Sequence, residues 1–366
     1  MLVSFISFVI VIGICVLAHE YGHYITARLL GVQVHEFAFG MGPLVSQVKK
    51  AGPDGRTYML WSWRLFPIGG FCRLAGMGEE DDGETVIPSM GFNEQPVWKR
   101  FFILLNGSLF NIVLAFLLTA VFLWGHGGQD MYDTKIGSMM EGYPAQHAGF
   151  QIGDRVTAVN GEPVSEWREM SNSLRAAALK GDVVFTVERN GRALTLTTPI
   201  PPRKEHGYPM LGITPAFRRY AAWEALTNAA GYIWNMTKLM LKGIWDWLSR
   251  KQEVDVTGPI GIASMSGQAM REGAWSFITF LALITLNLGL LNLFPFPALD
   301  GGRIAFLIPE VLLRRRLPER LENWVNAAGL VVLLLLMVVV TGMDLSNLYG
   351  ERIEQIRSFF VSLFVD

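Results

Sequence analysis

Two histidines and a glutamate near the start of the chain form the pattern HEYGH, which runs from His19 through Glu20 to His23. On a helix, residues four apart lie on one face, so the two imidazoles stand one turn apart. Imidazoles at that spacing can share one zinc ion, with Glu20 beside them to accept a proton from the attacking water. The pattern therefore predicts zinc-assisted hydrolysis, with Glu20 as the catalytic residue.

A hydrolytic zinc site needs a third protein ligand and an open position for water. Asp300 is the best candidate, because it follows Pro295 and Pro297, which end a helix and re-aim the chain. An ionised carboxylate at membrane depth also needs a cation as its partner. On the residues alone, the alternative that Asp300 only caps a helix stays open. Three other acids lie among arginines and are expected to pair with them: Glu310, Glu319 and Glu322.

The elements that must position these side chains are membrane-spanning helices. Of 366 residues, 51% are hydrophobic and 17% are charged, whereas average soluble chains carry about 25% charged residues. Four apolar runs have membrane length: 2–30, 101–124, 275–294 and 324–343. They predict a polytopic α-helical membrane protein with four transmembrane helices, the first of them retained rather than cleaved as a signal peptide. HEYGH lies inside that first helix, where ionisable residues indicate function.

Between the first two spans, the pattern changes from helical to strand-like. Leu44–Lys49 and Thr57–Trp63 flank a turn and predict a β-hairpin, and Leu65–Phe71 reads as an apolar strand broken by glycines. Apolar backbone that is not helical is tolerated at a bilayer only where protein or a wet cavity covers it. We therefore expect a membrane-associated β-hairpin or loop that dips toward the metal.

A soluble insert and an amphipathic helix follow the second span. Residues 130–215 combine the strands Arg155–Val159, Val183–Arg189 and Ala193–Thr198 with the helix Glu166–Ala178, which predicts one inserted α+β domain without a catalytic constellation. The next helix carries lysines on one face and apolar residues on the other, as interfacial helices do. The predicted organisation is a first membrane part, the insert, the interfacial helix and a second membrane part, at residues 1–125, 130–215, 219–250 and 270–366.

Lysines and arginines gather in two loops, residues 31–100 and 295–323. The positive-inside rule places both loops in the cytoplasm. Both termini and the insert are then extracytoplasmic, and the metal site lies toward the cytoplasmic side. A net charge of −1 without a basic patch argues against nucleic acid as a partner. The two cysteines, Cys15 and Cys72, are expected to be free thiols.

Taken together, HEYGH in the first span and NLFPFPALDGG after the third resemble the site-2 protease family of intramembrane zinc metalloproteases. The arrangement is most similar to the bacterial regulator-of-sigma-E type. The segment FPIGGF, residues 66–71, resembles the membrane-reentrant β-loop of the family. The insert resembles a single PDZ domain, through GYPA at 142–145, GDRV at 153–156 and the turn Asn160-Gly161.

The resemblance implies a set of functional residues around one Zn²⁺. His19, His23 and Asp300 would be the metal ligands and Glu20 the general base. Residues implied in substrate binding are Asn292 (alternatively a helix-terminal hydrogen bond), the strand residues Ile68, Gly69, Gly70 and Phe71, and the PDZ loop residues Tyr208, Leu211, Gly212 and Ile213. The strand would clamp an extended substrate by β-addition, and the PDZ loop would hold peptide C-termini.

The implied function is cleavage of the transmembrane segments of single-span membrane proteins in the bacterial cytoplasmic (inner) membrane. Anti-sigma factors and signal-peptide remnants are the substrates that the resemblance suggests. One alternative is a membrane-anchored zincin that acts on cytosolic or misfolded proteins. Another is a non-catalytic PDZ membrane scaffold. The alternatives differ in whether Asp300 completes a metal site with the first span.

Overall fold

The computed structural model describes residues 2–51, 58–77, 87, 89–200, 209–249 and 257–365. The chain divides into two compact units, and each is described by itself. One consists of Met1–Ala120 with Leu226–Asp366, and the other of Val121–Ala225. We call them the membrane unit and the insert unit.

Four helices are long and apolar enough to cross a membrane: α1 (Leu2–Leu29), α2 (Val97–Gly125), α7 (Ala274–Asn292) and the part Glu319–Ser346 of α9 (Glu319–Val365). They confirm the prediction of a polytopic helical membrane protein. The second helix begins four residues earlier than predicted, at Val97, directly after Pro96. Its charged start is tolerated because the Arg100 guanidinium forms a buried ion pair with Glu310 of α8 (Asp300–Leu313).

Two helices of the membrane unit, α6 (Pro259–Glu272) and α8, were not predicted from the pattern. α6 is rich in small and polar residues, so its local sequence carries a weak helix signal. Contacts with α1 and α9 stabilise α6 where its own helix propensity is weak. A side chain at Gly267 would collide with Ser4 of α1, and the Asp344 carboxylate of α9 accepts hydrogen bonds from the amides of Gly258 and Gly261, at 3.0 and 2.8 Å.

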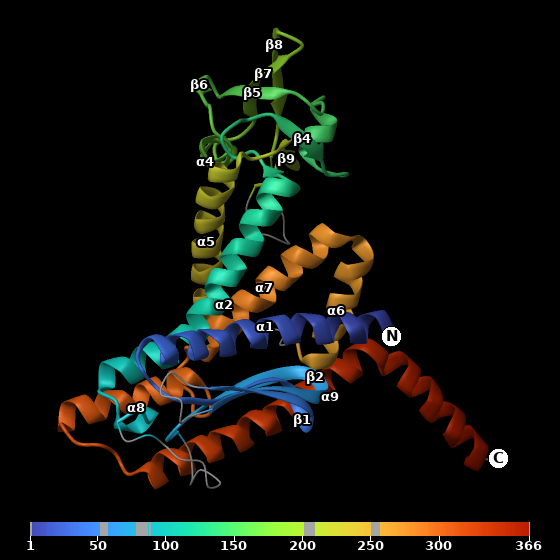
Figure 1. The fold of residues 1–366 in the computed structure, drawn as a ribbon. Helices are drawn as coiled ribbons and strands as arrows, with labels where there is room; N and C mark the ends of the chain where they lie inside the picture. Colours follow the sequence, from blue (N-terminus) through green and yellow to red (C-terminus); the bar gives the residue numbers. More distant parts are fainter. Residues whose placement is uncertain are drawn as a thin grey trace. The chain divides into compact units, whose positions relative to one another are not determined.

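The strands β1 (Val34–Ala51) and β2 (Tyr58–Leu74) pair antiparallel and lie alongside α1 (Figure 1). Both strands bend, so residues 36–39 of β1 pair with 60–63 on one side and with 70–73 on the other. The resulting order of segments is 44–51, 58–64, 34–39 and 70–74. Residues 70–74, which we call the edge segment, are on the outside of this sheet, and no further strand pairs with their outer edge among the described residues.

This sheet is more extensive than the strands that the sequence predicts. Residues 34–43, for which the sequence predicts no particular element, belong to β1, because Gly40 and Gly42 adopt φ near +84° and let the strand bend. Leu65–Phe71 is not a separate strand but continues β2. Thr57, the first residue of the predicted hairpin strand Thr57–Trp63, lies outside the described residues.

Rings from three elements pack the sheet against the first span. Tyr24 of α1 contacts Phe37 and Trp61 edge-on, with ring centroids 5.4 and 5.5 Å apart. A buried carboxylate, Glu36, ties the segments together, because it accepts hydrogen bonds from the Ser62 hydroxyl and, at 2.7 Å, from the Arg64 guanidinium. Burial of these rings holds β2 beside the helix that carries HEYGH.

In the insert unit, a four-stranded sheet has the order β6-β5-β7-β8. The strand and helix positions match the predicted α+β pattern closely, and Phe185 and Val187 of β7 are fully buried in its core. Its elements are β3 (Gly128–Gln129), β4 (Ile136–Met139), α3 (Pro144–His147), β5 (Arg155–Val159), β6 (Glu162–Pro163), α4 (Trp167–Ala178), β7 (Val183–Arg189), β8 (Arg192–Thr198), β9 (Ile213–Pro215) and β10 (Phe217–Arg218). The likeness to a PDZ domain stays a prediction.

One long helix, α5 (Ala222–Leu248), occupies the range of the predicted interfacial helix. It is not among the helices apolar enough to span a membrane. Its predicted position on the membrane surface stays a prediction, and so do the functional assignments of the four predicted domain ranges.

A buried carboxylate in the insert unit gives a test of its stability. Asp154 is buried and receives two hydrogen bonds from Arg189, both at 2.7 Å, and one from the Gln151 amide at 2.9 Å. Burial opposes its ionisation, but these hydrogen bonds outweigh burial and lower the pKa of Asp154. A lowered pKa in the folded state means that ionised Asp154 stabilises the unit at neutral pH and that this contribution is lost on acidification below about pH 4.

We therefore expect Asp154→Asn to lower the free energy of opening of the insert unit by about 1–3 kcal/mol at pH 7. Hydrogen exchange of the β5 and β7 amides, measured by mass spectrometry on the full chain in detergent, reports this change. Glu141→Asn, at an exposed position of the same unit, is the matched control. Equal protection in wild type and Asp154→Asn would contradict the assignment.

Candidate active site

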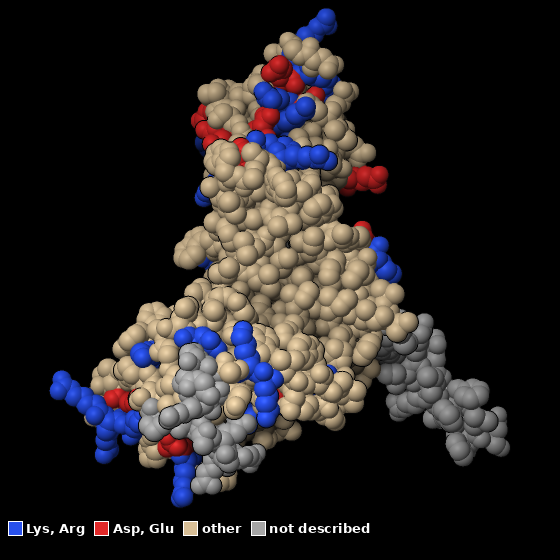
Figure 2. All heavy atoms as spheres, viewed as in Figure 1, with Lys and Arg blue, Asp and Glu red and all other residues tan. Residues whose placement is uncertain are grey.

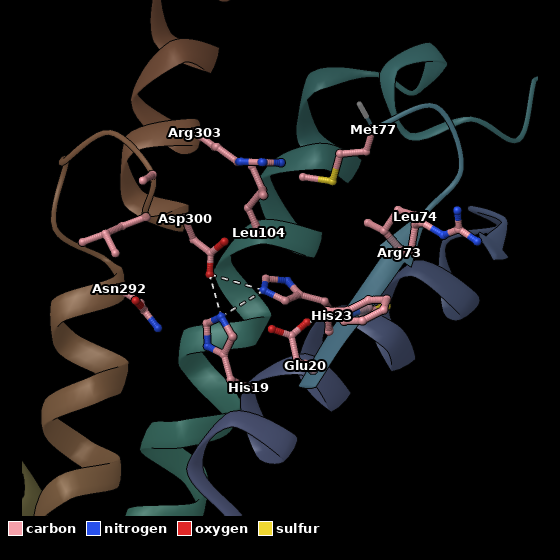
Figure 3. A pocket seen from close by; sticks show the side chains of 14 residues that line it. His19, Glu20, His23, Arg73, Leu74, Met77, Leu104, Asn292, Asp300 and Arg303 are labelled. Carbon is pink, nitrogen blue, oxygen red and sulfur yellow. Dashed lines mark hydrogen bonds and ion pairs between the residues drawn. The ribbon is translucent and has the colours of Figure 1, made fainter. Parts of the chain in front are cut away.

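The side chains of His19, His23 and Asp300 converge on one point in the membrane unit (Figure 3). The two histidines come from α1, and the aspartate is the first residue of α8. The two histidine Nε2 atoms lie 3.1 Å apart, and Asp300 Oδ2 lies 3.0 Å from His19 Nε2 and 3.3 Å from His23 Nε2. In the described part of the chain, this is the one cluster of three His, Cys, Asp or Glu side chains close enough to hold a metal ion.

The orientation of His23 is set by α2. Its Nδ1–H donates a hydrogen bond of 2.8 Å to the backbone carbonyl of Ile103. A carbonyl oxygen can only accept, so Nδ1 carries the proton and the lone pair of Nε2 faces Asp300. A histidine ligand held in this way by its second nitrogen is typical of metal sites.

A glycine of α2 makes room for both imidazoles. A Cβ atom at Gly107 would collide with the His23 ring and crowd the His19 ring. The helices therefore approach closely only because position 107 has no side chain. Asn106, next to it, donates a hydrogen bond of 2.9 Å to the Thr26 hydroxyl and ties α2 to α1.

The chain between α7 and α8 turns Asp300 back toward α1. α7 ends at Asn292, and the Ala298 amide donates a hydrogen bond of 3.1 Å to the Asn326 side chain. Gly302 is buried against the carbonyl of Phe296, where a side chain would not fit. The N-cap of α8 is Leu299, and the Asp300 carboxylate faces the histidines instead of capping the helix.

The donor set fits a zinc ion. Zinc–ligand bonds of about 2.0–2.1 Å in a tetrahedron separate the ligand atoms by about 3.4 Å, close to the observed 3.0–3.3 Å. Asp300 Oδ2 is buried and has no hydrogen bond, and neither does His19 Nδ1. Electron-pair donors that face one another across a buried space repel unless a cation lies between them. The arrangement of two neutral imidazoles and one carboxylate is one that zinc accepts.

Glu20 lies beside this cluster and is held by the edge segment. Its Oε2 accepts a hydrogen bond of 2.8 Å from the Cys72 amide. Cys72 pairs with Phe37 of β1 on the inner side of the edge segment. Its amide donates to Glu20 and not to β1, so this amide points outward, away from the rest of the sheet. The free edge of β2 therefore faces the catalytic candidate. Burial, and to a smaller extent the nearby Glu20 carboxylate, raise the pKa of the Cys72 thiol, so this neutral thiol is a poor metal ligand.

These residues line a cavity of about 420 Å³. Asn292 faces it from the end of α7, on the side of His19 (Figure 3). Of the predicted strand residues, Phe71 lines the cavity, whereas Gly69 and Gly70 do not, and Gly70 packs against Ala38 and Leu17. The side chain of Ile68 lies outside the described residues.

The predicted PDZ loop belongs to the insert unit. Leu211 is buried, and its carbonyl accepts a hydrogen bond of 3.0 Å from the Ala145 amide. Gly212 has φ +83° and lies against the side chain of Tyr143, and Ile213 begins β9. Tyr208 lies outside the described residues.

Two residues that line the cavity were missed from the sequence: Cys72 and Arg303. Arg303 had a usable signal, because it follows Asp300 by three positions and a helix puts such residues on one face. Small residues around Gly107 in the second span predict close helix packing, but not that this packing makes room for the two imidazoles. Cys72 contributes a backbone amide, which leaves no motif in a single sequence.

Comparisons with known proteins agree with this geometry. A family model described as peptidase family M50 matches residues 7–336. A relative in Fusobacterium nucleatum is 30% identical over 352 residues, covering 95% of this chain and 100% of the relative. Relatives in Campylobacter jejuni and Clostridium acetobutylicum are 29% and 31% identical over 363 and 353 residues, covering 95% and 93% of this chain and 95% and 98% of the relatives. All three are named "putative zinc metalloprotease".

The close approach of α2 predicts that Gly107→Ala weakens metal binding. The added methyl group displaces the His23 imidazole, and we expect zinc affinity to fall by about 10- to 100-fold, as for lost support of a metal ligand. Competition with a chromophoric chelator on the purified protein measures the affinity. Gly231→Ala is the matched control, because nothing lies near that position. Wild-type zinc affinity in Gly107→Ala would contradict the geometry.

Proposed function

This chain belongs to peptidase family M50 and is a multi-pass membrane zinc metalloprotease, and from that premise we propose that it cleaves peptide bonds within membrane-spanning segments. One observation carries the proposal: HEYGH lies inside an apolar helix of membrane length. His19 is ten residues before Leu29, the end of α1, which corresponds to about 15 Å along the helix axis. A site at that depth suits a substrate in the bilayer better than one in the cytosol.

In this proposal, His19, His23 and Asp300 hold the zinc ion, and Glu20 is the general base. When bound, the ion supplies Lewis acidity, which polarises a peptide carbonyl and acidifies a water molecule. Glu20 accepts a proton from the attacking water and passes it to the leaving amine nitrogen. The hydrogen bond from the Cys72 amide supports this role. It holds Oε2 of Glu20 and so orients the carboxylate, while Oε1 takes no part in that bond and can accept the proton.

The substrate must be extended before it is cleaved, because a helix hides its carbonyls in internal hydrogen bonds. The outer edge of the edge segment offers unpaired backbone groups next to Glu20, so a substrate strand can add there. Phe71 would contact the side chains of that strand. Asn292 would hold its backbone from the opposite wall of the cavity.

We propose single-span membrane proteins as the substrates, with anti-sigma factors and signal-peptide remnants as the suggested classes. The insert unit would act as a PDZ domain that holds peptide C-termini at Tyr208, Leu211, Gly212 and Ile213. The bilayer is then the shared environment of enzyme and substrate.

We further propose that the protein lies in the bacterial cytoplasmic (inner) membrane, with the active site toward the cytoplasm and both termini and the insert unit outside. The distribution of charge supports this orientation. On the face shown in Figure 2, lysine and arginine side chains of the membrane unit gather at the end that carries β1, β2 and α8.

The orientation predicts how introduced cysteines react in intact cells. In a background without Cys15 and Cys72, Asn172→Cys in the insert unit should react with a membrane-impermeant thiol reagent added outside. Arg315→Cys, after α8, should react only once the membrane is permeabilised. Labels are read on the purified protein. The reverse pattern would overturn the orientation and leave the chemistry untouched.

The proposed role of Glu20 predicts substrate trapping. Glu20→Gln should retain wild-type zinc content but lose turnover by about 10²- to 10⁴-fold, the usual contribution of a general base. In native membranes this variant should co-purify with uncut single-span proteins, identified by mass spectrometry. Glu141→Gln, exposed in the insert unit, is the control. Equal capture by the wild type and both variants would count against cleavage within the membrane.

A further inference from the structure

Arg303 is the one basic residue of α8 near its start, and it lines the same cavity as Asp300 and Glu20. Arg303 reaches this cavity because of its spacing from Asp300 along the helix. Asp300 turns toward the histidines, and a residue three positions later lies on the same face. Figure 3 shows Arg303 and Asp300 extending from α8 toward the same cavity.

The guanidinium of Arg303 has no hydrogen bond or ion pair within the described part of the chain. Two other arginines inside the membrane unit have ion-pair partners: Arg100 pairs with Glu310, and Arg64 with Glu36. Arg73, the second arginine at the cavity, also lies near Glu36, at 3.7 Å. Arg303 is half-buried, and none of the described residues provides a partner for its guanidinium.

The two acids that line the cavity, Asp300 and Glu20, have other contacts. Asp300 faces the two histidines, and one oxygen of Glu20 accepts the hydrogen bond from Cys72. A guanidinium in an apolar membrane unit is costly to desolvate, and such groups are usually functional. It presents five N–H donors in a plane, a geometry that suits two oxygens on one carbon.

Peptide hydrolysis creates that group. The oxygen of water forms a bond to the carbonyl carbon while a water proton moves to Glu20. The electron pair of the C=O π bond moves to the carbonyl oxygen, which becomes anionic. The C–N bond then breaks, its electron pair stays on nitrogen, and that nitrogen takes the proton from Glu20. The new carboxyl group ionises, so the same carbon carries anionic oxygen from the first step to product release.

We propose that Arg303 binds the oxygens of the scissile carbonyl carbon as they become anionic, and is thus a further catalytic residue of this protease. The inference rests on the proposed function, because it assumes that hydrolysis occurs at His19, His23 and Asp300. A donor that is already in place stabilises charge that develops in the transition state and requires little reorganisation. Arg303 reaches the cavity from the wall opposite the edge segment, so it leaves the strand-addition site open.

The test compares Arg303→Gln and Arg303→Lys with wild type in lipid nanodiscs, using a fluorogenic apolar peptide of about 20 residues. For Arg303→Gln we expect kcat to fall by about 100- to 1,000-fold, as for loss of one oxyanion donor. KM should change by less than about threefold, because the ground-state carbonyl is neutral. Arg303→Lys should recover part of kcat. Arg315→Gln, at an exposed arginine after the same helix, is the control.

Two measurements other than activity separate this role from a structural one. Zinc content by elemental analysis should equal that of wild type in both Arg303 variants. Affinity for a peptide phosphinate, whose tetrahedral group carries anionic oxygens, should fall in Arg303→Gln by about the same factor as kcat. Affinity for 1,10-phenanthroline, a neutral metal chelator, should not change.

The proposal is overturned if Arg303→Gln keeps kcat and phosphinate affinity within about threefold of wild type. It is also overturned if this variant loses zinc, because Arg303 would then support the metal ligands rather than the substrate. Glu20→Gln distinguishes failure of the proposed active site from failure of the proposed role of Arg303. If Glu20→Gln remains active, the proposed site itself fails, whereas inactive Glu20→Gln beside active Arg303→Gln removes only the role of Arg303.

Discussion

The mutual approach of three electron-pair donors, at 3.0–3.3 Å in a buried place, is the constraint on which the membrane unit depends. Two donors come from α1 and one from α8, so both helices must meet at one point although 277 residues separate His23 from Asp300 in the chain (300 − 23). The repulsion between such donors is relieved by a cation. Family membership and named relatives agree with zinc as that cation.

The packing around the cluster follows from this requirement. α2 can approach the imidazoles because Gly107 has no side chain, and the Ile103 carbonyl then sets the protonated nitrogen of His23. The turn before α8 likewise requires a residue without a side chain at Gly302, which packs against the Phe296 carbonyl. Two ion pairs join other elements: Glu36 with Arg64 joins segments of the sheet, and Arg100 with Glu310 joins α2 to α8. By contrast, Arg303 at the cavity has no partner among the described residues, which makes it a candidate for contact with substrate.

The sheet and the metal centre are mechanically connected. Glu20 lies on the helix that carries both histidines, and it accepts a hydrogen bond from the outer edge of β2 through Cys72. An extended substrate that adds to this edge would therefore lie next to the base, in the cavity that Arg303 also lines. In the proposed arrangement, one backbone edge would both orient the base and receive the substrate. Movement of the edge segment would affect positioning and chemistry together.

Local pattern alone determined the spans, the zinc motif and the strands of the insert unit, because hydropathy and periodicity are properties of consecutive residues. Asp300 could also be found, because two prolines and two glycines mark a sharp change of chain direction. Only the tertiary structure decided the segment order within β1 and β2, the existence of α6 and the contacts of Gly107 and Cys72. Each of these depends on atoms far apart in the chain: a bend lets one strand pair twice, Ser4 and Asp344 hold a helix of weak propensity, and a backbone amide reaches Glu20. Such contacts leave no period in the sequence, and for that reason they had to be seen in space.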